Sequence, residues 1–139
     1  MKNSLNLDNS LKFILAGNAL MTFQNKETGN RYTYKVRSPK NKKGIHFVSV
    51  LYGPDNTTNY TYIGTIFSEK DFVHTQKSRV QKTDTRFKVF DYVFNHLNKK
   101  DLSNKIEIYH EGKCGCCGRT LTVPESIEIG LGPHCANKI

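Results

Sequence analysis

All four cysteines of this 139-residue chain lie between residues 114 and 135, and this cluster constrains the fold more than any other feature. In an intracellular chain, clustered cysteines favour a bound metal over disulfides. Cys114 and Cys117 have the spacing at which two thiolates bind one ion at about 2.3 Å, and Cys135 follows at a separation typical of zinc ribbons. A segment this short has no core of its own, so we predict a structural zinc ion within residues 110–139.

The fourth ligand of this zinc site is open between three residues of the chain and an external ligand. His110 lies four residues before the first cysteine and is our first expectation. His134 is adjacent to a cysteine ligand, and adjacent ligands fit one tetrahedral ion poorly. Cys116 competes with its neighbour in the Cys-x-x-Cys turn. Two other interpretations are reduced cysteines without metal and a catalytic zinc ion, which requires an open coordination position and a base such as Glu111.

Hydrophobic periodicity predicts an α+β domain in residues 1–109, ahead of the zinc-binding tail at 110–139. Alternating apolar and polar residues, clearest in Arg31–Arg37, predict strands. The expected strands are 19–24, 31–37, 45–52, 60–67, 72–74 and 106–109, with a loop of turn-forming residues at 53–56.

Apolar residues at three- and four-residue steps between Phe87 and Leu97 predict an amphipathic helix over 85–98. A shorter helix is expected over 9–17, with Asn9 or Ser10 as its N-cap. We therefore predict an α+β fold: a small, mostly antiparallel sheet of four or five strands, with one main helix across one face and a C-terminal zinc-knuckle subdomain.

Motifs for catalysis and for membrane insertion are absent from the sequence. There is no P-loop, dinucleotide fingerprint or G-x-S-x-G elbow, and the twelve carboxylates do not cluster as a two-metal nuclease requires. No apolar run approaches the roughly 18 residues of a membrane span, and the first residues lack the apolar stretch of a signal peptide. We therefore expect a cytoplasmic protein that is not an enzyme and has no membrane partner.

Positive charge is concentrated in the first hundred residues. The chain has 21 Lys and Arg against 12 Asp and Glu, a net charge of +9, whereas residues 110–139 hold three of each sign. A basic surface favours a polyanion such as nucleic acid as partner. The residues expected to contact phosphates are Arg31, Lys35, Arg37, Lys40, Lys42, Lys43, Lys77, Arg79 and Lys82.

Tyr32 and Tyr34 alternate with the cations of residues 31–37. Aromatic rings beside cations are the combination that single-stranded nucleic acid binding uses. Both tyrosines nevertheless fall on the same face of the expected strand, so the alternation also fits tyrosines that face the core and cations that face solvent. Both interpretations stay open at this point.

The tail carries a longer pattern, Cys114-x-x-Cys117-Gly118-Arg119-x-Leu121-Thr122-x-Pro124-x-Ser126 followed by Gly130-x-Gly132-Pro133-x-Cys135. This pattern resembles a zinc-tail family of unknown function that recurs in proteins of bacteriophages and other mobile elements, sometimes at the end of helicase-like chains. Residues 31–34, 47–56 and 62–66 also resemble short stand-alone phage members. The resemblance implies metal binding by the three cysteines of the pattern, leaves the fourth ligand open and does not include Cys116.

Charge and resemblance together give one leading hypothesis and two alternatives. The leading hypothesis is a nucleic-acid-binding accessory protein of phage or mobile-element origin, acting in the cytoplasm of a host cell with a structural Zn²⁺ site. The first alternative is a protein-binding inhibitor, an anti-defence factor that blocks a host nuclease or another defence protein. The second alternative is a small enzyme or nucleotide-binding protein.

Overall fold

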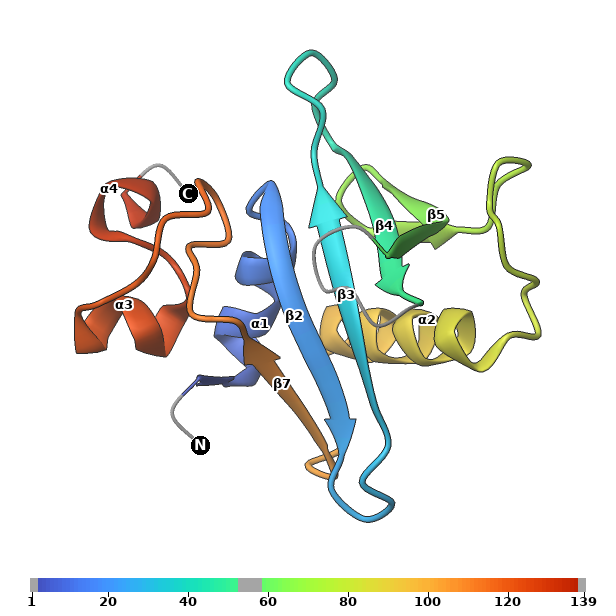
Figure 1. The fold of residues 1–139 in the computed structure, drawn as a ribbon, viewed down its shortest axis with the longest axis horizontal. Helices are drawn as coiled ribbons and strands as arrows, with labels where there is room; N and C mark the ends of the chain where they lie inside the picture. Colours follow the sequence, from blue (N-terminus) through green and yellow to red (C-terminus); the bar gives the residue numbers. More distant parts are fainter. Residues whose placement is uncertain (1–2, 53–58, 138–139) are drawn as a thin grey trace.

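A seven-stranded antiparallel sheet is the framework of the computed structural model, which describes residues 3–52 and 59–137. The strands lie in the order β1-β7-β2-β3-β4-β5-β6 (Figure 1). Their bounds are β1 Ser4–Leu5, β2 Asn18–Asn25, β3 Arg31–Arg37, β4 Ile45–Leu51, β5 Tyr60–Phe67, β6 Asp71–Val73 and β7 Ile106–His110. Both edge strands are very short, which limits edge-to-edge pairing with other chains.

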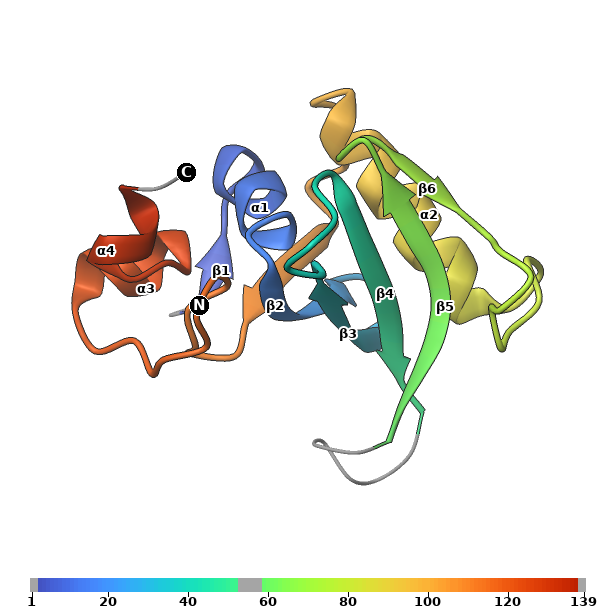
Figure 2. The same cartoon turned by 90° about the horizontal axis from the view of Figure 1, so that it is seen from above.

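Two helices, α1 (Leu7–Ile14) and α2 (Thr85–Asn98), pack on the same face of the sheet (Figures 1 and 2). Two short helices, α3 (Pro124–Ile129) and α4 (Pro133–Ala136), lie in the tail beyond β7. None of the helices in the described ranges is long and apolar enough to cross a membrane.

The core lies between the sheet and these two helices. Tyr34 and Val36, at alternate positions of β3, are fully buried, as the alternation requires. Phe90 of α2 packs against Tyr34 and Phe23, with ring centroids 5.1 and 5.7 Å apart. Burying each such ring contributes roughly 1.5–3 kcal/mol, so the aromatic contacts between α2 and β2–β3 anchor the helix to the sheet.

The predicted α+β class is confirmed, but the predicted strand and helix numbers are wrong in detail. The sheet has seven strands rather than four or five: β1 is too short to show a periodicity, and β6, which was expected near 72–74, pairs with β5 as a full member of the sheet. The second sheet-covering helix, α1, begins at Leu7 rather than 9, since Asn6 caps it by accepting from Asn9 N at 2.8 Å. The expected ranges 31–37, 60–67 and 85–98 are confirmed, and the expected loop at 53–56 lies outside the described residues.

The opposite face of the sheet is not covered by any helix of the described residues (Figure 2). Thr22 and Thr33 face each other there, with their hydroxyl oxygens 2.8 Å apart across the β2–β3 pair. Phe47 in the middle of β4 is 43% exposed although β4 is an interior strand. We call this side, formed by the outward residues of β2 to β5, the open face.

Candidate metal centre and basic sheet face

The candidate metal centre begins in a tight turn directly after β7. Gly118 N donates to the Cys114 carbonyl oxygen at 2.9 Å, and Cys114 N donates to the Arg119 carbonyl oxygen at 2.8 Å. Gly118 has a φ of +79°, which glycine adopts without the steric cost that other residues meet. The turn therefore presents the thiols of Cys114 and Cys117 to the same site.

Two short helices return the third thiol to this turn. Pro124 begins α3 and Pro133 begins α4, positions where the missing N–H of proline costs no helical hydrogen bond. Gly130 ends α3 with a φ of +76°, in the left-handed conformation common after a helix. The reversal at Gly130 lets α4 place Cys135 beside the first two cysteines.

Three sulfur atoms meet at this centre. The Sγ atoms of Cys114, Cys117 and Cys135 all lie within 4.8 Å of one another among the described residues. Cys114 and Cys135 are buried, at 1% and 4% exposed, and Cys117 is exposed. The cluster could hold a metal ion that prefers sulfur ligands, with two ligands shielded and the third at the surface.

The surroundings of Cys114 favour the thiolate that a metal needs. Its Sγ accepts hydrogen bonds from the backbone N–H groups of Cys116 at 3.4 Å and Gly132 at 3.3 Å. Burial raises the pKa of the Cys114 thiol, but these backbone donors outweigh burial and lower it from 9.0 to about 7. For Cys135, burial and then the neighbouring thiols raise the pKa to about 12, so its thiol is protonated at neutral pH. A bound cation would therefore displace this proton. The donor set therefore fits a thiophilic cation.

The structure does not bring His110, the first expected fourth ligand, into this sulfur group. His110 is 1% exposed and both ring nitrogens face backbone groups. Its Nδ1 accepts from Gly112 N at 2.9 Å, and its Nε2 lies 2.5 Å from the carbonyl oxygen of Ile127 in α3. In this geometry His110 connects β7 to α3, a tertiary role that spacing along the sequence does not reveal.

The other two expected ligands border the metal centre. A hollow of about 340 Å³ contains the three clustered thiols, and Cys116 and His134 also line it. Cys116 is half-buried and its thiol is among the groups that raise the pKa of Cys135, whereas His134 is exposed on α4. Both residues are therefore close enough to the sulfur group to remain candidates for the fourth position.

The tail is docked against the first helix of the chain. Gly115 donates to the Gly130 carbonyl oxygen at 2.9 Å and accepts from Asn18 N at 2.7 Å, which links the cysteine turn to α3 and to β2. The ring of Phe13 in α1 lies 5.8 Å from the ring of His110. An ion bound by the tail would therefore also stabilise its contacts with α1 and β2.

Three of the nine predicted basic residues lie on the open face. Arg31, Lys35 and Arg37 project from alternate positions of β3 toward it, while Tyr34 and Val36 between them are buried. Beyond β3 the chain enters the β3–β4 loop at the top of Figure 1. This loop adds three exposed cations, Lys40, Lys42 and Lys43.

The other predicted cations lie beyond the far edge of the same strands. Arg79 N donates to the Tyr62 carbonyl oxygen at 3.0 Å, so the segment with Lys77 and Arg79 runs beside β5. Lys82 is exposed just before α2. In residues 3–52 and 59–137, none of the nine predicted cations forms an ion pair. Glu111 lines the same hollow as Arg31, but no carboxylate of the described residues pairs directly with any of the nine cations.

The tyrosines that alternate with these cations face the core. Tyr34 is fully buried and donates a hydrogen bond from its hydroxyl to the Arg86 carbonyl oxygen at 2.7 Å. Tyr32 is half-buried and packs against the same core. The core interpretation of the tyrosines is therefore confirmed, and neither ring lies on the open face.

Other aromatic rings, which the sequence pattern does not reveal, occupy the open face. Phe47 and Tyr62 lie edge to face with ring centroids 6.3 Å apart, and the Lys35 ammonium group lies 4.8 Å from the centre of the Tyr60 ring. The pairing of Arg37 with Phe47 and of Lys35 with Ser49 places these rings beside the cations of β3. The alternation of β4 places Phe47 on the opposite face from Val48, but apolar residues occur on both faces of this strand, so the sequence does not show which face is exposed.

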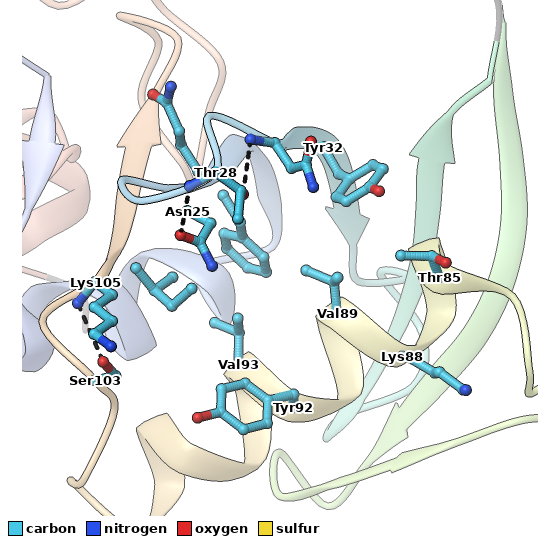
Figure 3. A pocket seen from close by; sticks show the side chains of 14 residues that line it. Asn25, Thr28, Tyr32, Thr85, Lys88, Val89, Tyr92, Val93, Ser103 and Lys105 are labelled. Carbon is cyan, nitrogen blue, oxygen red and sulfur yellow. Dashed lines mark hydrogen bonds between the residues drawn. The ribbon is translucent and has the colours of Figure 1, made fainter.

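A further hollow lies on the helix side of the sheet, between α2, the β2–β3 turn and residues 103–106. It measures about 390 Å³, and Tyr32, Val89 and Tyr92 border it (Figure 3). Lys88 and Lys105 are the charged residues that line it. Lys105 is already paired with Glu27 at 2.6 Å, so this hollow offers less free charge than the open face.

Comparison with known proteins gives information on the tail alone. No match was found among curated proteins or among solved structures. Residues 107–139, which include β7 from its second residue onward and all four cysteines, match the model of a family described as a family of unknown function, DUF6011.

Proposed function

We propose that this protein is a nucleic-acid-binding accessory protein of phage or mobile-element origin, whose open face contacts phosphates and whose tail carries a structural zinc ion. One observation carries the proposal: the cations of β3 lie on a sheet face that no described helix covers, and three more exposed cations follow in the β3–β4 loop. Unpaired cations along an accessible surface favour the phosphate backbone of nucleic acid as partner.

The length of the basic surface suits several phosphates. The cations run the length of β3, from Arg31 to Arg37, and seven residues of strand span roughly 20 Å at about 3.3 Å per residue. The phosphates of one nucleic acid strand follow each other at intervals of a few ångströms, so the strand and the loop together reach several of them. Each contact releases counterions, and affinity should therefore fall steeply as salt rises.

Zinc would act here by holding the end of the chain in place. Cys114, Cys117 and Cys135 would bind it, and we expect the fourth ligand from Cys116 or His134, since both line the same hollow. Bound zinc would supply charge to hold the thiolates together, and among the described residues no Asp or Glu lines the hollow around the sulfur group. The site therefore supports a structural role.

The test is a titration of labelled single-stranded DNA, duplex DNA and RNA by fluorescence anisotropy at low and moderate salt. We expect salt-sensitive binding that weakens at least tenfold when Lys40, Lys42 and Lys43 are changed to alanine. The matched control changes Lys12, Lys88 and Lys99 to alanine, which removes the same charge from exposed positions in α1, in α2 and at the C-cap of α2, on the other side of the sheet. Equal losses in both variants, or no binding at low salt, would contradict the proposal and make an acidic protein surface the next partner to test.

A further inference from the structure

We propose that the open face binds unpaired bases, so that the ligand is single-stranded nucleic acid rather than a duplex. This inference rests on the proposed function and adds a base-stacking site at Phe47 to the phosphate contacts. It is carried by the rings of the open face, which the phosphate argument does not use.

An exposed phenylalanine in the middle of an interior strand is the first observation. Phe47 is 43% exposed, while His46 and Val48 on either side of it are at most 3% exposed. β3 and β4 pair through Arg37 and Phe47, so a cation lies directly opposite the ring. A ring that solvent reaches beside a cation offers a flat apolar surface where a phosphate-bearing ligand would arrive.

A shallow hollow beside this ring is the second observation. It measures about 270 Å³, and its walls combine Phe47 and Pro39 with Lys35, Arg37, Ser38 and Ser49. Apolar and cationic groups thus lie on the same wall, and no acidic side chain of the described residues lines it. In this hollow a base could stack on the Phe47 ring while its phosphate contacts Lys35 and Arg37.

The rings of the open face are held in place by their neighbours. Phe47 contacts Tyr62 edge to face, and the Tyr62 hydroxyl lies 3.0 Å from that of Thr75. Tyr60 lies under the Lys35 ammonium group. Fixed rings lose little conformational freedom on binding, which favours stacking over a loose apolar contact.

Base stacking selects for single strands. In a duplex the flat faces of the bases are covered by neighbouring base pairs, whereas an unpaired base can place a face on an aromatic side chain. A sheet that presents rings and cations together is the arrangement that single-strand-binding domains use. Charge complementarity alone would not distinguish the two ligands, because both carry phosphates.

The test compares a labelled 15-nucleotide oligothymidine with a 15-base-pair duplex by anisotropy at one salt concentration. We expect the wild type to prefer the single strand at least tenfold and Phe47→Leu to lose roughly 10-fold in single-strand affinity, with duplex affinity unchanged. Phe47→Tyr, which keeps a flat ring, should retain binding, and Tyr92→Leu should too, because Tyr92 is 48% exposed on α2 across the sheet.

Two outcomes would contradict this inference without contradicting the proposed function. Equal affinity for both ligands, or an unchanged single-strand affinity in Phe47→Leu, would overturn the stacking site and leave phosphate binding intact. Absence of binding to both ligands would overturn the two proposals together. Thermal unfolding of Phe47→Leu at the wild-type temperature would show that a lost affinity comes from the ring and not from misfolding.

Discussion

Substitution of Gly130 by alanine tests how tightly the tail is docked on α1. A Cβ atom at Gly130 would lie 2.5 Å from Cδ1 and 2.9 Å from Cε1 of Phe13, a ring that is fully buried and has no room to move. The overlap costs about 1–3 kcal/mol, and the left-handed backbone at φ +76° adds about 1–2 kcal/mol. We therefore expect the free energy of unfolding to fall by about 2–5 kcal/mol.

Thermal unfolding followed by circular dichroism measures this loss. At roughly 4 °C per kcal/mol for a chain of this size, Gly130→Ala should melt roughly 8–20 °C below the wild type. Gly132→Ala is the matched control, since its Cβ would meet nothing within 4 Å and its φ of −67° suits any residue. This control should melt with the wild type.

A second background separates the two contributions. In a Phe13→Leu protein the ring edge is gone, so adding Gly130→Ala should cost only the backbone term of about 1–2 kcal/mol. If Gly130→Ala and Gly132→Ala have the same melting temperature in the wild-type background, this result would contradict close packing of Gly130 against the Phe13 ring.

Three further changes have defined outcomes. Asp84→Ala removes the acceptor that caps α2 at 2.8 Å from Arg86 N, and urea denaturation should show a loss of about 1 kcal/mol; an unchanged midpoint would contradict the cap. Burial raises the pKa of Tyr34 far above 10.0, so its neutral form stabilises the folded state below about pH 10, and this contribution is lost as the pH rises further. Tyr34→Phe should therefore be about 1 kcal/mol less stable than the wild type at pH 7, through the lost hydrogen bond, with a gap that narrows by pH 11 in urea titrations. Cys117→Ser should reduce zinc, measured by atomic absorption, to background, whereas retained stoichiometric zinc would exclude this thiol as a ligand.

The parts of the fold that have a strong periodicity are predictable from the sequence. The alternation in Arg31–Arg37 and the three- and four-residue steps in Thr85–Asn98 give β3 and α2 with their observed bounds. β1 pairs Ser4 with Tyr109 and Leu5 with Ile108, and two residues carry no pattern that could reveal this. The partners of a short strand depend on the rest of the fold rather than on local sequence.

The candidate sites divide in the same way. The clustering of Cys114, Cys117 and Cys135 is predictable from their spacing, because it depends on a tight turn and short helices formed by nearby residues. His110 has a suitable spacing too, but its nitrogens meet Gly112 and Ile127 once β7 joins the sheet. Phe47 was missed for a related reason: whether a strand residue is exposed depends on which face the helices cover.

The position of β2 between β3 and β7 has a consequence for the order of folding. β3 follows β2 after a short turn, whereas β7 is synthesised only after β4, β5, β6 and α2. One edge of β2 therefore stays without its partner strand while most of the chain leaves the ribosome, a stage at which chains are prone to aggregate and to recruit chaperones. The cysteines come after β7, so any metal that they bind would enter a chain whose last interior strand has already been made.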